Sequence, residues 1–222
     1  MQVVTVDLHH QVLTAWAEYR RTLSMPPEVL SFDFHTDVMR CFRRNAPDPE
    51  GDAWANPGIV ADAVARLRHD EHFDWALRGG AAAEVRIISL SPCAVEPEHE
   101  KMQVIRHPGL PDMETMLNAP EQFRPLAAAV LSDGFLAPLV GDKLPEPGFI
   151  LDVDCDYFLC REALFPEHRR IFDTLVKRAG LVTISRENDW VRLLKLPGEN
   201  IDGTTLAQTL EKVVYAVLET DC

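Results

Sequence analysis

Two short clusters of acidic side chains each follow an apolar run, and their residue types suit the binding of divalent cations. Residues 33–37 read Asp-Phe-His-Thr-Asp and follow the run 29–32, and residues 152–156 read Asp-Val-Asp-Cys-Asp and follow the run 149–151. Short apolar runs predict buried strands, so these acids stand where strands end. Ionised carboxylates crowded at such a place repel one another and lose hydration unless a cation lies among them. The sequence therefore predicts a metal site.

Both clusters carry their potential ligands at alternate positions, which point to one side of an extended chain. Two adjacent histidines follow another apolar run, at residues 2–6, and are placed to join them. Carboxylate and imidazole ligands without cysteine favour manganese or another hard divalent ion over a thiolate zinc site. The candidate ligands and catalytic groups, in chain order, are His9, His10, Asp33, His35, Asp37, Asp152, Asp154 and Asp156.

The apolar pattern along the chain predicts strands that alternate with helices. Strands are expected at 2–6, 28–34, 84–90, 149–151 and 181–185, with a short one at 102–105. Helices are expected at 10–23, from Pro57 to the glycines at 79–80, at 120–131, from Pro166 to about 180, and at 204–218, with loops at 40–56, 91–112 and 132–148. This order is typical of a single α/β domain over 1–222, with a mostly parallel central sheet in a three-layer α/β/α arrangement. Such sheets bind ligands outside the carboxyl ends of their strands, where both acidic clusters fall.

Composition narrows the class of protein. The formal net charge of −13 argues against a nucleic-acid partner and favours the approach of a cationic substrate, although an acidic surface also serves solubility alone. Five cysteines without a CxxC pair indicate reduced thiols in a cytoplasmic protein. No apolar stretch approaches the ~18–20 residues that cross a bilayer, so we expect no membrane association.

The clusters resemble the motifs of the ureohydrolases, the arginase and agmatinase superfamily. Their DxHxD motif is similar to residues 33–37, and their strand-ending SxDxD motif to residues 150–154, whereas their Gly-Gly-Asp-His turn is matched only in part by residues 7–9. The Asp-x-His-His start and the Asp-x-Asp-x-Asp-Tyr-Phe sequence resemble a divergent branch that includes peptide arginases, which convert arginine side chains of ribosomally made peptides into ornithine. The resemblance covers the amino-terminal third of the chain and residues 149–158.

The resemblance implies an arginase-like fold, two Mn²⁺ ions per chain and an arginine-containing peptide as substrate, with release of urea. Asp33 and Asp152 would bridge the ions, Asp37 and His9 would complete one, and His35 with Asp154 the other. His10 is the alternative to His9 as a ligand and otherwise has a proton-transfer role. Asp154 or Asp156 would guide a proton to the departing amine, and Glu187, just past the strand 181–185, would bind the guanidinium.

Other interpretations remain open. A deacetylase-type amidohydrolase with a single zinc, a hydrolase of a small guanidino compound, and a non-catalytic module with a structural cation fit parts of the pattern. The histidine pair at 9–10 could simply open a helix, Asp156 could be a cap, and Glu187 could only solvate a strand end. The sequence leaves homo-oligomerisation undecided. The other histidines have charged neighbours and are expected at the surface: His69, His72, His99, His107 and His168.

Overall fold

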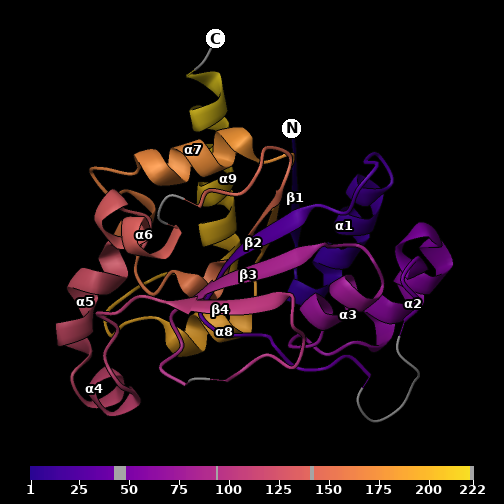
Figure 1. Cartoon of the computed structure of the whole chain (residues 1–222). Helices are drawn as coiled ribbons and strands as arrows, with labels where there is room; N and C mark the ends of the chain where they lie inside the picture. Colours follow the sequence, from indigo (N-terminus) through magenta and orange to yellow (C-terminus); the bar gives the residue numbers. More distant parts are fainter. Residues whose placement is uncertain (43–48, 94, 141–142, 221–222) are drawn as a thin grey trace.

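The protein is described by a computed structural model that covers residues 1–42, 49–93, 95–140 and 143–220 (Figure 1). Within these residues, six strands form one sheet in which every neighbouring pair is parallel. The strands are β1 (Gln2–Val6), β2 (Glu28–Asp33), β3 (Glu84–Ser89), β4 (Met102–Arg106), β5 (Ile150–Asp154) and β6 (Leu181–Ser185). The predicted α/β class is confirmed, including the short strand expected near residues 102–105.

The strand order, β1-β6-β5-β2-β3-β4, creates a point in the middle of the sheet where the chain reverses its direction of travel. From β2 the chain moves outward through β3 to β4, and it then returns to β5 on the other side of β2 and moves outward through β6. In open parallel sheets, ligands bind outside the carboxyl ends of strands at such a switch point. The acidic clusters lie at the carboxyl ends of β2 and β5, the two strands that flank it.

Helices cover both faces of the sheet (Figure 1). On the α1 face lie α1 (Val12–Arg20), α2 (Pro57–Arg66) and α3 (His72–Arg78), and on the α7 face lie α5 (Pro120–Ala128), α6 (Asp133–Val140), α7 (Arg170–Arg178) and α9 (Gly203–Glu219). The pleat of β2 sends Val29 to the core of the α1 face and Leu30 and Phe32 to the core of the α7 face. This alternation decides which polar side chains of the central strands can meet.

The helical segment expected between Pro57 and Gly79 is divided into two helices. Leu67 leaves the helical conformation, with φ −65° and ψ 148°, and the chain becomes helical again at His72. Of the predicted loop 40–56, residues 43–48 lie outside the described part of the chain.

The prediction of a loop between residues 132 and 148 was wrong over its first half, because α6 forms there despite Gly134 and Pro138. Burial of Phe135 and Leu136 in the core outweighs the poor helix propensity of Gly134 and Pro138. Two further short helices, α4 (Met113–Asn118) and α8 (Asn188–Leu194), were also missed.

No single helix in the described ranges is long and apolar enough to cross a membrane, and α5 with α6 pass that test only as a pair bent by 81°. Cys93, Cys155 and Cys160 are free thiols, as expected, and Cys222 lies outside the described residues.

Candidate metal centre

The register of the central strands decides which acids lie at the same height. Ser31 of β2 pairs with Asp152 of β5, which pairs in turn with Thr183 of β6. Two residues further on, Asp33 ends β2 and Asp154 ends β5. Side chains two residues apart share a face, so Asp33 and Asp154 meet at the sheet edge, one pleat above Asp152.

His9 lies in the middle of the acidic side chains and is 1% exposed. It belongs to a single 3₁₀ turn (His9–Gln11) that follows β1. Its Nδ1 atom is 3.1 Å from Asp37 Oδ2, 3.2 Å from Asp154 Oδ2 and 3.5 Å from Asp33 Oδ2. Of the two adjacent histidines, His9 is therefore the one that the fold brings to the acids.

His35 and Asp156 form the more open side of the cluster. His35 Nδ1 is 2.8 Å from Asp156 Oδ2 and 3.8 Å from Asp33 Oδ1, and the His35 side chain is 28% exposed. Asp156 lies in a 3₁₀ turn (Cys155–Tyr157) after β5, and its Oδ1 atom accepts a hydrogen bond from the backbone N–H of Phe34 at 3.2 Å. Asp156 thus links the ends of β2 and β5 and belongs to the centre itself.

Three groups of side chains in the described ranges have potential ligand atoms within 4.8 Å of one another: His9 with Asp33 and Asp154, Asp33 with His35 and Asp156, and His9 with Asp37 and His72. Asp33 belongs to two of these groups. Its Oδ2 atom is buried and has no hydrogen-bond partner among the described residues. A bound cation would satisfy this buried carboxylate oxygen, and the two groups that contain Asp33 have the donor types that divalent ions prefer.

The ionisable groups of the cluster shift one another's pKa values strongly. Burial, and then repulsion by Asp37 and Asp156, raises the pKa of Asp33 well above its usual value. Burial alone would lower the pKa of His9, but Asp152 and Asp154 outweigh it and hold that pKa well above the ordinary range. Burial is outweighed at His35 too, where Asp156 contributes most to raising the pKa to about 9. Carboxyl and imidazolium groups thus share the protons that bound ions would displace.

Asp152 occupies a different environment from the acids above it. Its Oδ1 atom accepts a hydrogen bond from Thr183 Oγ1 at 2.6 Å, and its Oδ2 atom accepts one from Ser31 Oγ at 2.7 Å and lies 2.8 Å from His9 Nε2. Asp152 belongs to none of the three groups found within the described residues. The bridging role that the motif resemblance implied for it thus has no support from this geometry.

Glu187, the candidate partner of the substrate, reaches the centre from the end of β6. It is 5% exposed, and its Oε1 atom accepts a hydrogen bond from the backbone N–H of His9 at 2.6 Å. Burial raises its pKa despite that hydrogen bond. Its backbone is left-handed, with φ 38°, which is rare for a residue other than glycine and occurs at functional sites.

His10 is half-buried beside the centre and outside the three ligand groups of the described residues. Its Nδ1 atom is buried without a hydrogen-bond partner in the same part of the chain, and burial, followed by the charge of His9, lowers its pKa. A neutral imidazole at this place suits proton transfer better than His9 does.

His72 was missed, and its expected surface position is wrong. Its side chain is fully buried in α3, and its ring centroid is 4.2 Å from that of His9. Its Nδ1 atom donates to His69 O at 2.9 Å, which leaves Nε2 as the acceptor, buried and without a partner among the described residues. Burial, and then His9, lowers its pKa well below the ordinary value. The charged neighbours in sequence were misleading, since Asp74 is itself buried and paired with Arg78.

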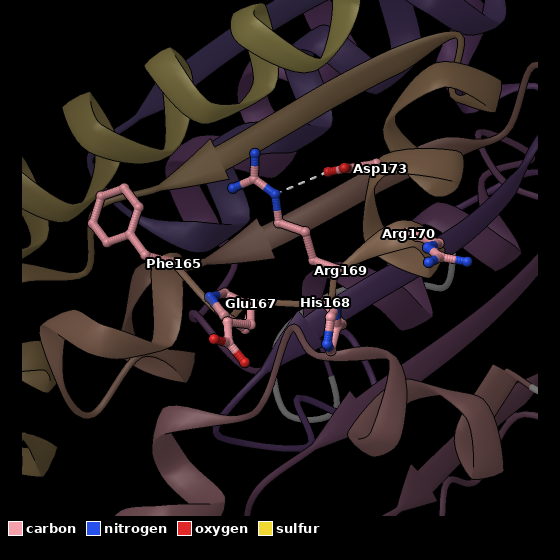
Figure 2. A pocket seen from close by; sticks show the side chains of 7 residues that line it. Phe165, Glu167, His168, Arg169, Arg170 and Asp173 are labelled. Atoms are coloured by element: carbon pink, nitrogen blue, oxygen red, sulfur yellow. Dashed lines mark ion pairs between the residues drawn. The ribbon is translucent and has the colours of Figure 1, made fainter.

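A separate hollow lies at the start of α7, and Figure 2 shows its side chains. Arg169 Nε is 3.1 Å from Asp173 Oδ1 there. The lining residues are Phe165, Pro166, Glu167, His168, Arg169, Arg170 and Asp173. None of the predicted site residues lines this hollow.

The fold is similar to that of one solved amidino hydrolase. Proclavaminate amidino hydrolase from Streptomyces clavuligerus superposes with a TM-score of 0.53 and 13% sequence identity, covering 97% of this chain and 63% of that protein. A hypothetical agmatinase from Burkholderia thailandensis gives a TM-score of 0.47, also at 13% identity, covering 97% of this chain and 58% of that one. The chain therefore spans less than two thirds of these proteins. No protein-family model matches the sequence, and no curated protein matches it either.

Proposed function

We propose that the protein is a metal-dependent hydrolase of the ureohydrolase type, which cleaves a C–N bond of a guanidino group. The observation that carries this proposal is the position of Asp33, whose carboxylate belongs to two adjacent groups of ligand atoms at the switch point of the sheet. The motif resemblance and the fold shared with proclavaminate amidino hydrolase support the same chemistry.

The proposed centre holds two Mn²⁺ ions, because carboxylate and imidazole ligands without thiolates suit that ion. Asp33 would be shared between them, His9 and Asp154 would bind one ion, and His35 and Asp156 the other. Asp37 and His72 stand beside His9 and would complete its ion. This assignment uses the second and third acids of residues 152–156 as ligands, two residues further on than the motif resemblance implied.

A guanidinium is cationic and stabilised by resonance, so its carbon is a poor electrophile. When bound, two divalent ions lower the pKa of a water molecule and make hydroxide available near neutral pH. Glu187 would hold the guanidinium through charge-assisted hydrogen bonds, and the surrounding carboxylates would stabilise its charge. His10, neutral and close by, is suited to pass a proton to the departing amine. The balanced reaction converts a guanidino group and water into an amine and urea.

The substrate proposed for this reaction is an arginine residue within a peptide, which would become ornithine. The similarity of the Asp-x-His-His and Asp-x-Asp-x-Asp-Tyr-Phe sequences to those of peptide arginases supports that choice. His35 is the most open member of the centre, so a side chain would enter from its side. Trp190, whose ring centroid is 4.6 Å from that of His35, would border this entrance.

The test is to incubate the purified Mn²⁺-loaded protein separately with an arginine-containing peptide, free arginine and agmatine. We expect release of urea and a mass loss of one CN₂H₂ unit per converted residue from the peptide. Urea from agmatine or free arginine alone would keep the guanidino hydrolase and overturn the peptide substrate. No urea from any substrate would overturn the proposed function, and a single tightly bound zinc ion would favour deacetylation.

Replacing Glu187 with glutamine is expected to weaken substrate binding without unfolding the protein. The amide oxygen still accepts the hydrogen bond from His9 N–H, whereas the negative charge that would face the guanidinium is lost. A hydrogen bond to a charged group contributes about 1.5–3 kcal/mol, so kcat/KM should fall roughly 10- to 100-fold, mostly through KM. Steady-state kinetics would measure this, with the exposed Glu84→Gln at the opposite end of the sheet as control. An unchanged KM would remove Glu187 from substrate binding.

A further inference from the structure

We infer that Asp152 is a positioning residue, which holds the His9 imidazole by Nε2 so that Nδ1 faces the ligand cluster. This inference rests on the proposed metal-dependent function and concerns a residue that the motif resemblance would place among the ligands. Its basis is the sheet register together with the hydrogen bonds that Asp152 makes.

Asp152 is surrounded by protein donors inside the sheet layer. Its strand neighbours on the two sides, Ser31 and Thr183, each direct a hydroxyl group to it, at 2.7 Å and 2.6 Å. All three residues are fully buried, with no measurable exposure. Each carboxylate oxygen of Asp152 thus has a partner, unlike Oδ2 of Asp33, so the protein alone satisfies this acid.

The hydrogen bonds fix the direction in which each proton points. The Thr183 hydroxyl accepts from Trp16 Nε1 at 3.1 Å, so its own hydrogen is free to be donated to Asp152. Trp16 in turn stacks on Phe73, with ring centroids 5.9 Å apart, in the core of the α1 face. The carboxylate of Asp152 is therefore anchored by rigid neighbours rather than by side chains that can turn away.

His9 Nε2 lies 2.8 Å from Asp152 Oδ2, and both oxygens of Asp152 already accept hydroxyl hydrogens, from Ser31 and Thr183, so Oδ2 acts as an acceptor towards Nε2 too. Nε2 must therefore carry a hydrogen, whether the ring is neutral or protonated. The proton that His9 loses when it binds an ion comes from Nδ1, the atom that faces Asp33, Asp37 and Asp154. Asp152 thus selects the tautomer and the ring orientation that a ligand needs.

Carboxylates that hold the second nitrogen of a metal-binding histidine change metal affinity by about 10- to 100-fold when they are replaced. Each experiment would use the full chain with Mn²⁺. We expect Asp152→Asn to bind two ions per chain, with an affinity lower by that factor. Asp156→Asn, in contrast, should lose one ion, since Asp156 is a proposed ligand. Asp74→Asn, a buried acid paired with Arg78 outside the centre, is the matched control and should keep both ions at unchanged affinity.

A second readout follows His9 directly. In the metal-free protein, ¹⁵N chemical shifts should report a hydrogen held on Nε2 of His9, and Asp152→Asn should give a mixture of tautomers. Ser31→Ala is a milder change, which removes one hydrogen bond to Asp152 and should lower Mn²⁺ affinity by a few fold. This variant would test the inference if Asp152→Asn does not fold.

The outcomes separate the inference from the function on which it rests. Loss of one ion from Asp152→Asn at unchanged affinity for the other would make Asp152 a ligand and overturn the inference, as would an unchanged His9 tautomer. A native protein that binds no divalent ion would instead overturn the proposed function, while the tautomer measurement would still decide whether Asp152 orients His9.

Discussion

Replacing Asp33 with asparagine is expected to abolish guanidino hydrolysis while leaving the metal-free protein at least as stable as the native one. Loss of the carboxylate shared by two ligand groups should remove at least one ion and several kcal/mol of transition-state stabilisation, about 10³-fold or more in kcat. The asparagine oxygen can still accept the hydrogen bond from His35 N–H, which Asp33 Oδ1 now accepts at 2.7 Å. Function and stability should therefore respond in opposite directions.

The expected gain in stability has a specific cause. Burial and repulsion by Asp37 and Asp156 raise the pKa of Asp33, which means that its ionised form costs free energy in the metal-free fold. Asparagine does not ionise, so the replacement removes that cost. Activity, bound metal and thermal unfolding of the metal-free protein would be measured together.

The control is Asp74→Asn, since that buried acid accepts hydrogen bonds from Arg78 Nε at 2.7 Å and from Cys41 N–H at 3.0 Å. Its replacement should lower the unfolding temperature and leave kcat unchanged. If Asp33→Asn behaved in the same way, Asp33 would be a structural residue and the proposed centre would be wrong.

The affinity for Mn²⁺ is expected to fall steeply as the pH is lowered. His35 has a pKa of about 9 in the metal-free protein, against 6.5 for the unperturbed group, and the pKa of His9 is raised as well. Below these values each ring carries a proton that an ion must displace. The dissociation constant should therefore rise by about tenfold per pH unit for each proton displaced.

The stability of the metal-free protein should show the opposite trend. Because the pKa of His35 is higher in the folded state, its contribution to stability is fully present below pH 6.5 and is lost as the pH rises through about 9. The increase in unfolding temperature that Mn²⁺ produces should accordingly grow between pH 6.5 and pH 9, as thermal denaturation with and without metal would measure. An increase that is constant or larger at low pH would mean that the imidazoles do not bind the ions.

Much of the fold was predictable from local patterns, because strands and amphipathic helices are marked by periodicity within a few residues. All six strands and the first and last long helices were found in this way. Helix α6 was not, because tertiary burial supports it against unfavourable residues such as Pro138. The burial of His72 was not predicted for a similar reason, since it depends on how α3 packs against His9 and Trp16.

The sequence by itself determined that two acidic clusters stand at the carboxyl ends of buried strands, because apolar periodicity and residue type are local properties. It could not determine which acids face each other. Ser31 and Asp152 are 121 residues apart in the chain, and only the pairing of β2 with β5 sets them side by side. That register places Asp152 beneath His9 and Asp154 at the height of Asp33, and a shift of two residues, which keeps every side chain on its face, would have put Asp152 opposite Asp33 instead.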